Sequence, residues 1–181
     1  GASLKRDIVI SSSAELNLAE SLIDATSTAD YIIEGNVHID LTTAANYGGT
    51  ASLTAAVARV SALTAKIATV LGSVTATTVS SSAALNMDKL TYVKGGLNIA
   101  GKMPTVSALA TTGSLTLDTD DGTYSLPTLV SAGPIVIDIS AVVSVTSIQF
   151  ANVASTHIIK PLRINDIANK VIGAVQCTLY P

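Results

Sequence analysis

The sequence predicts a mostly β, single-domain protein: a right-handed parallel β-solenoid with coils of about 20 residues. Short triplets with apolar first and third residues recur along the chain. Each triplet is expected to form a strand with two inward side chains and one outward. The segments between triplets share an apolar-x-x-apolar pattern, which is typical of a second wall of the same coil. Stacked coils of this kind bury a continuous apolar core and pair their strands in parallel.

The triplets are evenly spaced in the second half of the chain and more widely spaced in the first. They begin at Ile8, Val37, Val74, Leu97, Leu115 and Ile135, which gives successive steps of 29, 37, 23, 18 and 20 residues. Most triplets follow a glycine, which is expected to adopt positive φ in the preceding turn. These glycines are Gly35, Gly72, Gly95, Gly113 and Gly133. A β-sandwich is the alternative, because its strands also recur between turn signals.

The elements are expected in the following order. Residues 1–35 form an N-terminal cap, in which the apolar set starting at Leu16 has helical spacing. Residues 36–155 hold the repeats, with a helix over about 51–71 because apolar residues there are three or four apart. Residues 156–181 close the stack as a C-terminal cap, since open strand edges need protection.

The composition excludes several classes of protein. Of 181 residues, 48% are hydrophobic and 13% are charged, so the chain is apolar enough to fold. The net charge of −3 argues against a nucleic-acid partner, which requires a basic surface. No uninterrupted apolar stretch is long enough for membrane insertion. The low charge also favours a homo-oligomer that covers part of the surface.

The single cysteine excludes an intramolecular disulfide and a cysteine-based zinc site. Cys177 lies in an alternating apolar run, which predicts a buried structural thiol.

Residues 125–137 carry the clearest coil, with the pattern Ser-Leu-Pro-x-Leu-x-x-x-Gly-x-Ile-x-Ile. This pattern resembles the receptor L-domain and other leucine-rich-like repeats of bacterial surface proteins and phage fibres, over about residues 72–155. The Asn that follows the strand in leucine-rich repeats is not kept, because Asp118, Asp138 and Ala100 stand near that place. The resemblance implies a non-catalytic binding or adhesion role in an extracellular, cell-surface or virion protein.

Outward positions of the expected strands form a polar row, which we interpret as a ligand-binding face. Its hydroxyl, amide, imidazole and carboxylate groups could hydrogen-bond the hydroxyls of a glycan, or contact a protein receptor. A solvated sheet face with no ligand is the alternative. The candidate residues are His38, Asp40, Thr75, Asn98, Thr116, Asp118 and Asp138.

One acidic run suggests a metal. Asp118, Asp120 and Asp121 precede Gly122, and clustered carboxylates are ligands that Ca²⁺ prefers. The same run is also ordinary turn chemistry, and the later Glu of an EF-hand is missing. A turn and a calcium site both fit, and no other cofactor is expected.

The expected function is therefore recognition of a glycan or protein receptor by a non-enzyme. The alternative is a structural or assembly domain of a fibre, capsid or surface layer. A polysaccharide-cleaving enzyme is less favoured because His38 and His157 lie far apart and no Gly-x-Ser-x-Gly motif occurs. An ice-binding face is less favoured because the row of Thr75, Thr77 and Thr116 is interrupted.

Overall fold

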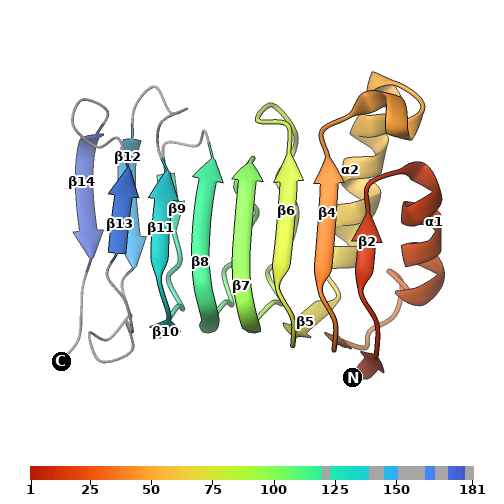
Figure 1. Cartoon of the computed structure of the whole chain (residues 1–181), viewed down its shortest axis with the longest axis horizontal. Helices are drawn as coiled ribbons and strands as arrows, with labels where there is room; N and C mark the ends of the chain where they lie inside the picture. The colour runs from red at the N-terminus through yellow and green to blue at the C-terminus, as the bar shows by residue number, and fades with distance from the viewer. Residues whose placement is uncertain (120–122, 139–144, 151–161, 166–170, 178–181) are drawn as a thin grey trace.

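The computed structural model describes most of the chain (Figure 1). The described residues are 1–119, 123–138, 145–150, 162–165 and 171–177. Side chains are described for residues 1–119 and 124–138. Residues 156–161, which begin the predicted C-terminal cap, lie outside the described residues.

The strands belong to two sheets, and every described pair within them is parallel. The larger sheet has eleven strands and the smaller has three. The larger contains β1 (Ala2–Leu4), β2 (Ile8–Ile10), β3 (Tyr31–Ile33), β4 (Val37–Leu41), β5 (Ile67–Val70), β6 (Val74–Thr78), β7 (Tyr92–Gly101), β8 (Thr111–Thr119), β10 (Ser131–Ala132), β11 (Ile135–Asp138) and β13 (Leu162–Asn165). The smaller contains β9 (Thr123–Ser125), β12 (Val145–Phe150) and β14 (Val171–Cys177).

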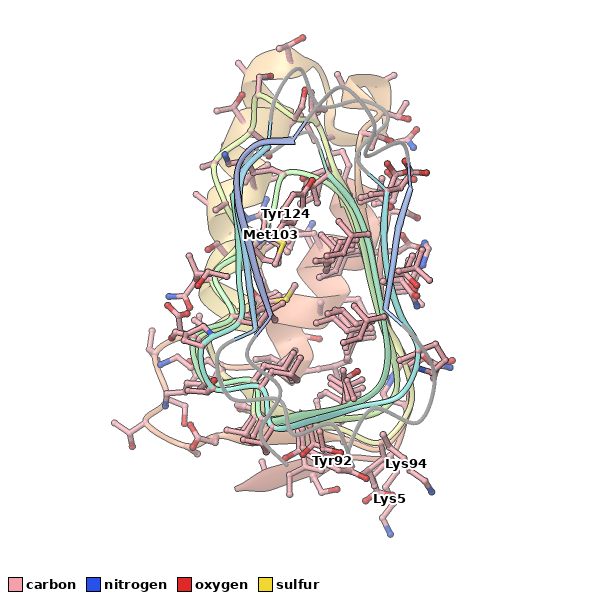
Figure 2. The ribbon with its side chains drawn as sticks, turned by 90° about the vertical axis from the view of Figure 1, so that its left-hand side faces the viewer. Lys5, Tyr92, Lys94, Met103 and Tyr124 are labelled. Carbon is pink, nitrogen blue, oxygen red and sulfur yellow. The ribbon has the colours of Figure 1, made fainter. Side chains whose placement is uncertain are left out.

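The larger sheet has two arms that meet at a corner. The first arm consists of β1, β3, β5, the start of β7, the start of β8, and β10. The second arm consists of β2, β4, β6, the rest of β7 and β8, β11 and β13. Since β7 and β8 run through the corner without a break, they join the two arms. Figure 2 looks along the stack, with Lys5 and Lys94 at the corner.

Two α-helices follow strands of the second arm near the N-terminus (Figure 1). Helix α1 (Ser13–Leu22) begins with a cap in which the Ser12 hydroxyl accepts a hydrogen bond from the Glu15 N–H at 3.3 Å. A short 3₁₀ helix (Ala44–Tyr47) precedes α2 (Thr50–Thr64), which buries one apolar face. Within the described residues, no helix is long and apolar enough to cross a membrane.

The prediction of a closed, mostly β solenoid is wrong. The described strands form two parallel sheets, most of them in the larger one, accompanied by two helices; this is an α/β-like arrangement, and no closed solenoid is evident among the described residues. One physical reason is that α1 and α2, which lie where the sequence predicted helical segments, fill the long connections after β2 and β4. In addition, β7 and β8 continue through the corner, which merges the two columns of strands into one sheet. The triplets themselves do pair in parallel and in register.

The helix expected over about 51–71 is shorter than its apolar spacing suggests. It ends at Thr64, and the N–H of Lys66 then donates to the Leu63 carbonyl at 3.0 Å to close the last turn. Residues Ile67–Val70 form β5 instead. Pairing with β3 and β7 favours the strand there, because Ile and Val pack well on a pleated surface.

The corner glycines are needed for a different reason from the expected one. Among the described glycines, positive φ occurs only at Gly48, Gly49 and Gly101. A Cβ added at Gly72 would instead lie 2.5 Å from the Gly35 carbonyl oxygen, and one at Gly95 would lie 2.8 Å from that of Gly72. The corner therefore requires glycine because the backbones of successive strands stack there without room for a side chain.

The core lies inside the angle between the two arms. Alternate residues of the second-arm strands β2, β4, β6 and β11 point into it, and in β4 the inward Val37, Ile39 and Leu41 are buried while His38 is exposed. The buried faces of α1 and α2 belong to the same core. This alternation leaves every second strand residue on an outward face, where it is available for contact with a partner.

Candidate functional site

The strand register brings the predicted polar row together on the outward face of the second arm. His38 pairs with Thr75, Thr75 with Asn98, and Asn98 with Thr116 on successive strands. Adjacent parallel strands lie about 4.8 Å apart, so the four side chains form a continuous row. Val136 on β11 follows Thr116 and interrupts the polar row, and Arg163 on β13 is paired with Val136.

A second row runs alongside and contains the predicted aspartates. Asp40 begins it, and Asp118 and Asp138 are paired in register further along. The Asp40 carboxylate already accepts hydrogen bonds from the Thr42 N–H at 3.1 Å and the Thr42 hydroxyl at 2.6 Å. Asp40 is therefore engaged in a local turn, whereas Asp118 is exposed on the face.

The calcium prediction falls largely outside what the structure describes. Asp118 is at the end of β8, while Asp120 and Asp121 are outside the described residues. Among the residues with described positions, no group of three His, Cys, Asp or Glu side chains could hold a metal ion. The calcium site stays a prediction. Cys177 lies in β14, and its side chain is likewise not described.

A polar hollow of about 310 Å³ opens at the beginning of this face, and we call it the His38 hollow. It combines hydroxyl, amide, imidazole and carboxylate side chains with a comparable amount of apolar surface. Its volume is within the range of small-ligand sites. Its lining residues are Asp7, Val9, Asn36, Val37, His38, Ser73 and Thr75.

One wall of the His38 hollow is held in place by a chain of side-chain hydrogen bonds from strand to strand. The Asn36 N–H donates to the Asp7 carboxylate at 2.7 Å. The Ser73 N–H donates to the Asn36 side-chain oxygen at 2.9 Å, and the Gly96 N–H donates to the Ser73 hydroxyl at 3.1 Å. Because each side chain fixes the next backbone segment, this wall is formed before any ligand arrives.

The side chains of His38 and Thr75, which also line the hollow, do not take part in this chain of hydrogen bonds. No side-chain hydrogen bond joins His38 or Thr75 to another residue in the described part of the chain. An imidazole and a hydroxyl about one strand spacing apart can each donate and accept hydrogen bonds. This arrangement suits recognition of a ligand with several hydroxyl groups.

Reasoning from the sequence missed Asp7, Asn36 and Ser73 as wall residues. Asn36 and Ser73 occupy the single position between a corner glycine and the following triplet. A short polar side chain at this repeated position is the sequence signal by which Asn36 and Ser73 could have been identified. They are the residues that can reach the N–H group of the next strand.

Comparisons with protein-family models, with curated proteins and with solved structures found no match to this chain.

Proposed function

We propose that this chain is a non-catalytic recognition module of a cell-surface, secreted or virion protein, and that it binds a glycan through the second arm. The observation that carries the proposal is the His38 hollow, where a hydrogen-bonded wall lies beside the unengaged side chains of His38 and Thr75. A glycan presents hydroxyl groups at short intervals, and these match a row of donors and acceptors. A protein receptor with a polar surface loop is the other expected ligand.

The rigidity of the sheet supports this proposal physically. Binding costs less when the contacting groups are already ordered, and the parallel strands fix the spacing of the row. Single contacts with sugar hydroxyls are weak, but many copies on one surface raise the overall affinity. A surface or virion protein would supply those copies.

The test is a glycan-array screen of the purified chain with two variants. We expect His38→Ala and Thr75→Val to weaken binding of a neutral glycan about tenfold, which corresponds to about 1.4 kcal/mol. Thr77→Val is the matched control, because Thr77 lies two residues along the same strand outside the hollow. Binding that is unchanged in both hollow variants would place the ligand elsewhere.

Assembly into a larger structure is the second candidate, and one observation favours it. Among the described strands, β1 pairs only with β3, and β2 pairs only with β4, so each has an edge without a strand partner. Val9 and Leu18 are 42% and 49% exposed, on β2 and on α1. An open edge with apolar neighbours can accept another chain. Light scattering that shows a concentration-dependent oligomer, reduced by Val9→Asp, would support assembly.

A further inference from the structure

The outward face of the first arm carries a row of hydroxyl groups that is separate from the His38 hollow. Thr69 pairs with Tyr92, Tyr92 with Thr111, and Thr111 with Ser131, so the four residues are aligned across successive strands. With neighbouring strands about 4.8 Å apart, the row extends about 14 Å. That length matches a few sugar residues laid across the strands.

These hydroxyl groups are not used by the fold. None of the four donates or accepts a side-chain hydrogen bond within the described part of the chain. Neighbouring threonines behave differently: the Thr91 hydroxyl donates to the Ala68 carbonyl at 3.1 Å, and the Thr112 hydroxyl donates to the Ser114 carbonyl at 2.7 Å. The row therefore has its full hydrogen-bonding capacity available for a ligand.

Tyr92 adds an aromatic surface to the row. Its side chain is 37% exposed, whereas Tyr31, Tyr47 and Tyr124 are buried, so it is the one exposed aromatic ring among the described side chains. Leu71, which is 41% exposed, directly follows the neighbouring strand β5. An exposed tyrosine offers an apolar ring face and a polar hydroxyl, and the C–H face of a sugar ring can pack on it.

Lys94 places a positive charge next to this ring. It lies two residues after Tyr92 on β7, points outward at the corner, and is exposed (Figure 2). The described ion pairs are Arg59 with Glu20 and Lys89 with Asp30, so Lys94 has no acidic partner within the described part of the chain. An exposed lysine without an acidic partner attracts an anionic ligand by its charge.

Glu34 also lies at this corner, and its carboxylate is not in an ion pair with Lys94 in the described part of the chain. Glu34 directly follows β3, whereas Lys94 is on β7. Strand β5 lies between β3 and β7 and separates the two residues. The Glu34 carboxylate also accepts a hydrogen bond from the Ser3 hydroxyl at 2.5 Å. Lys5 projects from the same corner as Lys94 (Figure 2).

We infer that the first arm binds an acidic saccharide, that is, an oligosaccharide bearing carboxylate or sulfate groups. A sugar ring packs on Tyr92, the hydroxyls of Thr69, Thr111 and Ser131 bond the sugar hydroxyls, and Lys94 pairs with the acidic group. This surface does not depend on the His38 hollow.

The test is isothermal titration of the full chain with an oligogalacturonate and with the corresponding neutral oligogalactose. The acidic oligosaccharide is expected to bind about tenfold more tightly than the neutral one, with an affinity that falls as salt is raised. Tyr92→Ala and Lys94→Gln are each expected to weaken acidic binding about tenfold, which corresponds to about 1.4 kcal/mol. Circular dichroism checks that both variants fold.

Two control variants test whether acidic binding depends on this surface in particular. Lys102→Gln makes the same charge change just after the other end of β7, and it is expected to change the acidic affinity less than twofold. His38→Ala should leave acidic binding intact. Equal loss in Lys94→Gln and Lys102→Gln would overturn the inference, as would acidic binding that survives Tyr92→Ala.

The result for the neutral sugar separates this inference from the proposed function. Neutral binding that depends on His38, without acidic preference, overturns the inference and leaves the proposed function standing. Acidic binding that requires Tyr92 but not His38 supports the inference even if the hollow is inactive. Binding of an acidic peptide in place of any saccharide contradicts the inference.

Discussion

The corner of the sheet and its two outward faces place different demands on the sequence. At the corner, backbones of successive strands approach so closely that only glycine fits, as at Gly72 against Gly35. On the faces, side chains such as those of His38 and Tyr92 point away from the core and make no described hydrogen bond within the chain. The corner therefore determines the fold, and the faces are free to determine the ligand.

The largest effect should come from filling the corner. Gly72→Val would put a side chain within 2.5 Å of the Gly35 carbonyl oxygen, and two strands would have to separate. We expect a loss of about 2–3 kcal/mol in the free energy of unfolding, measured by urea denaturation. Thr77→Val on the outward face is the control, with a change of about 0.5 kcal/mol or less. Equal stability of the two variants would contradict the proposed difference between the corner and the outward face.

A smaller effect is expected from the hydrogen bonds beside the corner. Asn36→Ala removes the acceptor for the Ser73 N–H, which lies 2.9 Å from the Asn36 side-chain oxygen. A loss of about 0.5–1 kcal/mol should follow, since one ordinary hydrogen bond is exchanged for one with water. Because the same bond holds one wall of the His38 hollow, ligand affinity should fall as well. Unchanged affinity would show that the wall does not need this bond.

Variants of the outward faces should show the opposite behaviour, with a larger effect on ligand binding than on stability. His38→Ala and Tyr92→Ala remove outward side chains, so the free energy of unfolding should change by about 0.5 kcal/mol or less. Ligand binding should nevertheless be reduced in both variants. Thermal unfolding followed by circular dichroism checks the stability. A loss well above 1 kcal/mol for either variant would mean that the face also supports the fold.

The smallest effect concerns pH at the start of α1. The Ser11 hydroxyl and N–H donate to the Glu15 carboxylate, and these bonds lower the pKa of Glu15. A carboxyl with a lowered pKa in the folded state stabilises the fold above its unfolded pKa, and this contribution is lost as pH falls through the folded pKa. Glu15→Gln should therefore be less stable near pH 7, and the difference should shrink in acid. A difference that is constant with pH contradicts this account.

Part of the fold could be predicted from the sequence because it depends on local pattern. The triplets beginning at Val74 and Leu97 alternate apolar and outward residues, and they pair in parallel as expected. The arrangement of the whole chain depends on what fills the connections. Helical spacing predicted the segments that form α1 and α2, but spacing alone could not show that β7 would run through the corner and join the two columns of strands.

The candidate site was predictable only in part for a similar reason. His38 and Thr75 follow the corner glycines at a constant distance, so a repeat search finds them. The row on the first arm has no constant spacing, because Tyr92 precedes its glycine by 3 residues and Thr111 precedes Gly113 by 2. The register shift between β7 and β8 at the corner brings them into line, and only the structure shows it.

The central claim is that the outward faces recognise saccharides while the corner holds the fold. The most direct measurement is a glycan-array screen run in parallel on the unaltered chain, His38→Ala, Tyr92→Ala and the control Thr77→Val, all checked for folding by circular dichroism. We predict that the unaltered chain and the control share their hits and that each face variant loses a different subset. A folded chain that binds no glycan, or face variants that bind as the control does, would contradict the account.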